Sequence, residues 1–278
     1  MALMALMALP FGLGALRGLL SEIESSTRTE QTIAVGGAQD LAAVLRRELA
    51  RGAEAGAIRP GDSTEGAAVL LYVLGHAPTD ADEQALRRAR RARTPVVAVA
   101  AGPVPGEASI PYVLATDVVR VPPGEGFPLE EIAQAIASRL GEAGAPLAAR
   151  IPLLRGAVCD VLTSSFSRKN GILAAATFVT GADLPLLTVN QFRLVLRIAQ
   201  AHGAKGGRER LSDLAATFGA GIGLRALARG LLEAVPVAGW VLKGTVAYAG
   251  TRAIGEAAVL RFELGARPQQ AATSPAAP

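Results

Sequence analysis

Hydrophobic residues follow two different patterns along the chain. Between residues 31 and 140, short apolar runs such as residues 69–74 (VLLYVL) alternate with charge-bearing stretches of helical period such as residues 80–93. A near-continuously apolar run of this length is typical of a strand in a sheet that is covered on both faces. Strands that alternate with helices predict a small parallel, doubly wound α/β sheet. Beyond residue 150 only the helical period remains, which predicts an all-α helical bundle.

The expected elements follow from where each run begins and ends. In the first half we expect strands at residues 33–35, 69–74, 96–100, 112–115 and 118–121, and helices at 40–51, 80–93 and 129–140. Asn170-Gly171 is a helix stop signal, and Asp183 can cap a later helix that has Pro185 in its first turn and ends at His202-Gly203. In the second half we therefore expect helices at 151–170, 172–179, 183–202, 211–235 and 240–263.

These patterns divide the chain into four parts. They are an apolar and amphipathic N-terminal segment (1–30), the α/β domain (31–145), the helical domain (150–265) and a disordered tail (266–278). The tail has the composition of a disordered segment, and GEAGAP, just before the helical domain, has that of a linker. The first nine residues, MALMALMAL, lack the positive charges of a secretory signal. They are either a membrane-surface anchor or a frayed start, and both interpretations stay open.

Composition favours closely packed helices and an anionic surface as a partner. Hydrophobic residues make up 50% of the chain but aromatic residues only 4%, and there are 31 glycines. Small residues allow helix backbones to approach closely. The net charge of +4 is compatible with an anionic lipid surface and too small to indicate nucleic acid. No apolar, charge-free run reaches the roughly 18 residues that a transmembrane helix needs.

The supply of chemically reactive side chains is small. A single cysteine, Cys159, excludes an internal disulfide, and two histidines, His76 and His202, are few for a zinc site or a catalytic triad. We expect Cys159 to be a buried small residue and His76 to belong to a loop-end cap. The sequence thus predicts no catalytic residues, no cofactor and no metal, and therefore a protein that is not an enzyme.

The loop after the first expected strand has the place of a phosphate-binding loop but not its chemistry. A P-loop reads G-x-x-x-x-G-K-[ST], in which the lysine and the hydroxyl hold the phosphates and Mg²⁺. Here Gly36 fits the first position, but Leu41, Ala42 and Ala43 stand where the second glycine, the lysine and the hydroxyl should be. We interpret Gly36-Gly37 as a tight turn between strand and helix.

Residues 67–102 nevertheless resemble the later part of an Era-like GTPase domain. A hydrophobic strand, an acidic helix start and the strand TPVVAVA occur in the order of that family. The guanine-reading N-K-x-D does not follow, because Ala100-Ala101-Gly102-Pro103 occupies its place. The resemblance implies a P-loop-NTPase-like scaffold that lacks the P-loop and the nucleotide-reading residues.

The C-terminal half resembles the domain-of-unknown-function 697 family, a helical module that often accompanies Era-like GTPases in bacteria. The segments 171–203 and 235–263 carry the likeness. The family is regarded as membrane-linked and has no established catalytic residues, so the resemblance implies packing or interface roles. The residues that match are Asp183, Pro185, Gln191, Pro236, Gly239, Gly250, Thr251 and Gly255.

Together these observations predict a non-catalytic binding or scaffolding protein at the cytoplasmic side of a membrane. Its partners would be the membrane surface and a protein such as a GTPase that it regulates, with no nucleic acid, and homo-oligomers are compatible with this. The arginine run at 87–93 is read as a solvated helix face. One alternative is an enzyme that binds a nucleotide or small ligand in a crevice between residues 36–40 and 76–82. The other is a homo-oligomeric membrane structural protein.

Overall fold

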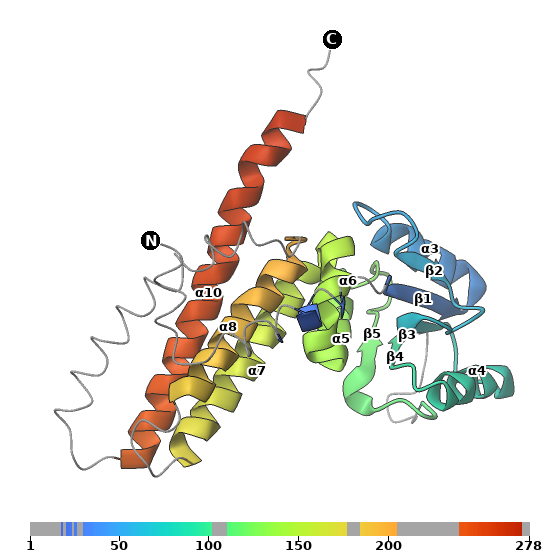
Figure 1. Ribbon diagram of the computed structural model, residues 1–278. Coiled ribbons are helices and arrows are strands. Elements are labelled where there is room, and N and C mark those ends of the chain that lie inside the picture. The colour runs from blue at the N-terminus through green and yellow to red at the C-terminus, as the bar shows by residue number, and fades with distance from the viewer. Residues whose placement is uncertain are drawn as a thin grey trace. The chain divides into compact units, whose positions relative to one another are not determined.

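The computed structural model describes residues 18, 21–23, 25–26, 30–101, 110–176, 184–204 and 239–273 (Figure 1). The chain divides into two compact units. The first, here called the α/β unit, is Thr27–Val161, and the second, the helical unit, is Met1–Ser26 together with Leu162–Pro278.

A five-stranded parallel sheet forms the centre of the α/β unit, as the sequence pattern predicts. The strand order is β2-β1-β3-β4-β5, and every neighbouring pair is parallel. The sequence did not predict β2, because three residues that end in a proline carry no strand pattern. The strands are β1 (Thr32–Gly37), β2 (Ile58–Pro60), β3 (Ala67–Leu74), β4 (Val96–Ala100) and β5 (Val118–Arg120).

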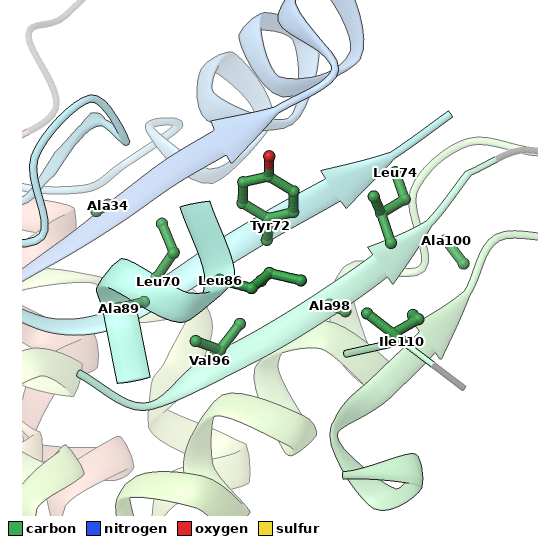
Figure 2. Close-up of a cluster of buried hydrophobic side chains, with 10 residues drawn as sticks. All are labelled: Ala34, Leu70, Tyr72, Leu74, Leu86, Ala89, Val96, Ala98, Ala100 and Ile110. Carbon is green, nitrogen blue, oxygen red and sulfur yellow. The ribbon is translucent and has the colours of Figure 1, made fainter. Parts of the chain in front are cut away.

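Helices surround this sheet and bury both sets of alternating strand residues. Figure 2 shows one face, where Leu70 and Tyr72 of β3 pack with Leu86 and Ala89 of α4 (Asp80–Arg91). The alternate residues of β3 point to the opposite face and are equally buried. Two further helices, α3 (Gln39–Leu49) and α5 (Leu129–Leu140), contact the sheet with buried leucine and isoleucine side chains.

The strand that we expected at residues 112–115 is absent, and that prediction is wrong. Tyr112 has a φ of 64°, in the left-handed region that a β-strand cannot contain. The next residues form a 3₁₀ turn, η1 (Ala115–Asp117), whose Asp117 is buried and pairs with Arg139 at 3.5 Å. The short strand expected at 118–121 is present as β5.

The expected linker at residues 141–146 is also wrong. The segment forms a 3₁₀ turn, η2 (Gly141–Gly144), and the start of α6 (Ala145–Arg150), which is followed by η3 (Pro152–Leu154). Gly144, Ala145 and Pro146 are buried, so this stretch is part of the core of the α/β unit rather than a tether. The boundary between the two units lies instead within α7 (Arg155–Ala176).

Three helices that lie side by side dominate the described part of the helical unit (Figure 1). They are α7, α8 (Leu184–Ala201) and α10 (Gly239–Thr273). The break that we expected at Asn170-Gly171 is absent, because α7 continues through both residues. Helix α10 extends to Thr273, past the point where we placed the start of the tail. The helix expected at 211–235 lies outside the described residues.

Candidate functional site

The α/β unit contains a small cavity at the carboxyl ends of β1 and β3. Its volume is about 220 Å³. It lies where the sequence placed a crevice between residues 36–40 and 76–82, and the structure brings members of both segments together there. The lining residues are Gly37, Ala38, Val73, Leu74, Gly75, His76, Thr79 and Asp82.

Backbone contacts between the end of β1 and β3 fix the first wall of this cavity. Gly36 and Gly37 are the last residues of β1, so the expected Gly-Gly turn is wrong and the chain turns at Ala38. Gly37 has a φ of 101°, and a Cβ atom there would lie 2.0 Å from the carbonyl oxygen of Val73. The amide of Ala38 donates to that same oxygen at 2.8 Å. This amide therefore bonds to β3, whereas a phosphate loop directs its amides at the ligand.

The second wall is the start of α4, which a capping box holds in place. One carboxylate oxygen of Asp82 accepts from the amide of Thr79 at 2.8 Å and from its hydroxyl at 2.6 Å. The other accepts from the hydroxyl of Tyr72 at 2.8 Å. Burial opposes ionisation of this carboxyl, but the hydrogen bonds from Thr79 and Tyr72 outweigh it and hold the pKa of Asp82 below its usual range. Burial, with Asp82 close by, raises the pKa of Tyr72.

Asp82 therefore gives this cavity a negative charge at neutral pH. That charge disfavours a phosphate group, which is itself an anion. His76, the other titratable residue of the lining, is exposed, and its Nδ1 lies 2.7 Å from the carbonyl oxygen of Ala77. Because a carbonyl can only accept, Nδ1 carries the hydrogen in this contact. Among the lining residues, the Thr79 hydroxyl is the one nucleophilic group that lies within hydrogen-bond reach of a base. It donates to the carboxylate of Asp82 as part of the helix cap.

The helical unit contains a buried polar seam, which we define as Asn170, Asn190, Gln191 and Thr251. The side-chain amides of Asn170 and Gln191 both donate to Thr251 Oγ1, at 2.9 and 3.0 Å. Asn190 donates to the side-chain oxygen of Asn170 at 2.8 Å. The seam therefore joins α7, α8 and α10. Asn170 and Thr251 are fully buried.

Small residues bring the backbones of α7 and α10 together beside this seam. A Cβ atom on Gly244 would lie 3.0 Å from the carbonyl oxygen of Gly171, and one on Gly255 would lie 2.6 Å from Thr163 Oγ1. Gly250, for which the family resemblance implied a packing or interface role, faces open space. Contact with Gly244 and burial of Asn170 explain why α7 does not end at Asn170-Gly171, since both residues have tertiary partners that offset their poor helix propensity.

Only some of the residues that matched the unknown-function family lie close to one another in the structure. Gln191, Thr251 and Gly255 lie at the contacts between α8, α10 and α7. Pro185 and Gly239 occupy the first turns of α8 and α10. Asp183 and Pro236 lie outside the described residues.

Sequence reasoning missed a second cluster, in which residues 22–26 contact polar side chains of α8. Glu22 Oε1 pairs with Arg193 at 2.5 Å and with Arg197 at 2.6 Å. Arg197 is also bonded to Ser26 and Gln200, and only 6% of it is exposed. The sequence did show the two arginines four residues apart on one helix face, but nothing in it paired that face with Glu22, 171 residues away.

Comparison of the chain with protein-family models, curated proteins and solved structures gave no match. Both family resemblances therefore stay predictions from the residues that carry them. Within the described residues, no helix combines the length and the apolar character that crossing a membrane requires.

Proposed function

We propose that this chain is a non-catalytic protein that associates with the cytoplasmic surface of a membrane. The helical unit contacts the lipid, and the α/β unit binds a protein partner, for which the GTPase-like resemblance favours a GTPase. The chain would then act as a scaffold or regulator that holds this partner at the membrane.

The distribution of polarity in the helical unit carries this proposal. Its centre holds the polar seam and the glycine contacts beside buried apolar side chains such as Phe166 and Phe192, and large aliphatic side chains are also exposed on all three helices, among them Leu186 of α8 at 51%. Ile172 is 71% exposed, Val241 56% and Leu260 56%. The small residues and interhelical hydrogen bonds at the centre are contacts that helices also use when they associate in an apolar environment, and the exposed aliphatic side chains offer a surface to lipid. The exposed Arg252–Glu256 pair on α10 favours a helix that lies at the interface.

The chemistry of the cavity supports a non-catalytic role for the α/β unit. The amide of Ala38 is engaged by β3, and Asp82 supplies a negative charge where a phosphate loop would supply a lysine. Leu41, Ala42 and Ala43 lie within α3. We infer that the unit is a doubly wound scaffold, since the strand order β2-β1-β3-β4-β5 is one that such open sheets adopt, and the GTPase-like resemblance of its sequence favours a P-loop type without the loop.

Membrane association is tested with exposed aliphatic residues of the helical unit. Replacing Ile172 and Val241 by serine removes apolar surface that would enter the lipid, and we expect the membrane partition coefficient to fall about tenfold for each. Val44→Ser on α3 is the matched control, because Val44 is also an exposed valine but belongs to the α/β unit. Flotation with vesicles measures the bound fraction. Equal binding by all three variants would overturn the assignment of the lipid contact to the helical unit.

The absence of nucleotide chemistry is tested separately by calorimetry. We expect no heat of binding from GTP or GDP with Mg²⁺ at micromolar protein. Restoring the phosphate-loop side chains at Ala42 and Ala43 alone is not expected to create binding, because the amide of Ala38 still bonds to Val73. Micromolar affinity of the wild-type chain for either nucleotide would contradict a non-catalytic scaffold.

A second candidate function follows from the cavity itself. Its position at the carboxyl ends of two parallel strands is where open α/β sheets bind ligands, but its volume of about 220 Å³ is below the range typical of ligand sites. A thermal-shift screen against nucleotides and small metabolites tests it. A hit that Thr79→Val abolishes would favour a small-ligand enzyme over the scaffold.

A further inference from the structure

We propose that the outer surface of α4 is a binding surface for anionic lipid headgroups. Five exposed arginines in the segment 87–93, here called the arginine patch, carry its charge. The whole chain has a net charge of only +4, so the remainder of the chain is close to neutral. The acids of α4 (Asp80, Asp82 and Glu83) lie in its first turn, so its C-terminal end and the residues after it carry a local excess of positive charge. The arginine patch consists of Arg87, Arg88, Arg90, Arg91 and Arg93.

Tyr112 adds an aromatic ring to the arginine patch. The guanidinium carbons of Arg87 and Arg90 lie 5.8 and 5.4 Å from the centre of the ring. The Tyr112 hydroxyl accepts from Arg87 Nε at 3.1 Å and donates to Glu83 at 3.4 Å. These contacts hold the ring on α4 although its backbone has a φ of 64°, which is uncommon for a bulky residue. We expected a solvated helix face here, since no aromatic residue is interleaved with the arginines in the sequence.

The chain also exposes an aliphatic side chain close to Tyr112 in the sequence. Leu114 follows Tyr112 by two residues and is 60% exposed. Each component of this surface matches one layer of a membrane interface. Guanidinium groups pair with phosphate and carboxylate headgroups, a tyrosine ring suits the boundary between polar and apolar layers, and an exposed leucine enters the acyl region.

The same geometry argues against nucleic acid as the occupant. Proteins that bind single strands through aromatic residues present an open ring on which a base stacks. Here two guanidinium groups already lie over the ring of Tyr112, so a base that stacked on it would have to compete with them. Among the described residues, Glu83 is the only acid that forms an ion pair with the arginine patch. The other arginines of this surface therefore have their charge available for headgroups.

This inference rests on the proposed membrane association, and charge variants of the full chain test it. The substitutions are Arg88→Gln, Arg90→Gln and Arg91→Gln in one protein. A basic residue near an anionic bilayer contributes a factor of about five to the partition coefficient, so the triple variant should bind about 100-fold more weakly. The matched control replaces Arg46, Arg47 and Arg51 by glutamine, which removes the same charge from α3 and the loop after it.

The probe is flotation with phosphatidylcholine vesicles that contain roughly one third phosphatidylserine, compared with phosphatidylcholine alone. We expect the patch variant to lose the preference for phosphatidylserine and the control to keep it. Tyr112→Asn, which tolerates the left-handed backbone, should weaken binding by a smaller factor. Circular dichroism of each variant excludes unfolding as the cause of a loss.

Three results would overturn the inference. If the two triple variants bind vesicles equally weakly, net charge rather than the arginine patch determines binding. The proposal that the protein associates with membranes is then unaffected. If the wild-type chain binds neither vesicle, the proposed function fails as well. If it binds single-stranded RNA or an acidic protein through the arginine patch while ignoring vesicles, the occupant is a different macromolecule.

Discussion

Gly255 is a residue at which the structure leaves no room for a side chain. A Cβ atom there would lie 2.6 Å from Thr163 Oγ1 and 2.7 Å from its Cγ2. We expect Gly255→Ala to lower the free energy of unfolding by about 1–3 kcal/mol, because the gain in helix propensity is smaller than the cost of the overlap. Gly250→Ala is the matched control, since it lies on the same helix in open space. It should raise stability by about 0.5–1 kcal/mol in urea unfolding. Equal effects at both glycines would refute the close contact.

At the residue scale, the ionisation of Asp82 makes the stability of the α/β unit depend on pH. The hydrogen bonds from Thr79 and Tyr72 lower its pKa despite burial. A carboxyl whose pKa is lowered by folding adds stability above its unfolded value of about 3.9, and this is lost as the pH falls through the folded value. We expect Asp82→Asn to cost about 1 kcal/mol at neutral pH and less at about pH 3.

The control for this prediction is Asp80→Asn, an exposed acid in the same first turn of α4. It removes the same charge near the helix N-terminus without breaking the capping box. Urea unfolding at the two pH values measures both variants. A cost of Asp82→Asn that does not change with pH would show that the carboxylate is not ionised in the capping box.

At the scale of elements, the polar seam predicts that two threonines of α10 behave differently. Both donate to the carbonyl four residues earlier, Thr245 to Val241 and Thr251 to Ala247. Only Thr251 also accepts from the amides of Asn170 and Gln191. Thr251→Val leaves two buried donors without an acceptor and should cost at least about 2 kcal/mol, whereas Thr245→Val should be close to neutral. Thermal unfolding compares them, and a similar small loss at both positions would show that the seam does not join the helices.

The ion pairs of Glu22 hold the residues around it against α8. Its carboxylate pairs with Arg193 and with the buried Arg197. Because the exposed carboxylate is partly screened by water, we expect Glu22→Gln to cost about 1–2 kcal/mol, less than a fully buried pair would. Glu256→Gln breaks an exposed pair on α10 and should change stability less. Limited proteolysis after residue 26 would increase in the Glu22 variant only, and no change would refute the attachment.

The sequence predicted those elements whose pattern is local. Strands β1, β3 and β4 and helices α3, α4 and α5 were found because each has an apolar run or a helical period of its own. The errors at Tyr112, at residues 141–146 and at Asn170-Gly171 have one cause. At residues 141–146 and at Asn170-Gly171, turn-forming or small residues looked like breaks, and at residues 112–115 an apolar run looked like a strand, but tertiary contacts decided the conformation of each.

The candidate sites were predicted less well, for the same physical reason. The crevice was located because parallel strands place their carboxyl ends on one edge of the sheet. The polar seam, the pairing of Glu22 with α8 and the position of Tyr112 on the arginine patch all join residues 20 or more positions apart. A single sequence contains no signal for such pairs, since each partner is an ordinary surface residue in its own local pattern.

At the scale of the whole molecule, two proposed membrane contacts of different physical nature are present on one chain. The aliphatic surface of the helical unit binds through the hydrophobic effect, whereas the arginine patch binds through charge. Linking them makes the second contact intramolecular, so their effects on the partition coefficient multiply. Salt screens charges but does not weaken the burial of apolar surface.

The response to salt therefore distinguishes the two contacts in the intact protein. We expect wild-type binding to vesicles with phosphatidylserine to fall as sodium chloride rises to about 0.5 M, where the Debye length is only a few ångströms, and then to reach a plateau. The arginine-patch triple variant should remain near that plateau at every salt concentration. The Ile172→Ser, Val241→Ser variant should retain the salt dependence but lose the plateau, because only its ionic contact remains. If wild-type binding falls to zero with salt, the helical unit makes no apolar contact with the bilayer, and the chain is held at the surface by charge alone.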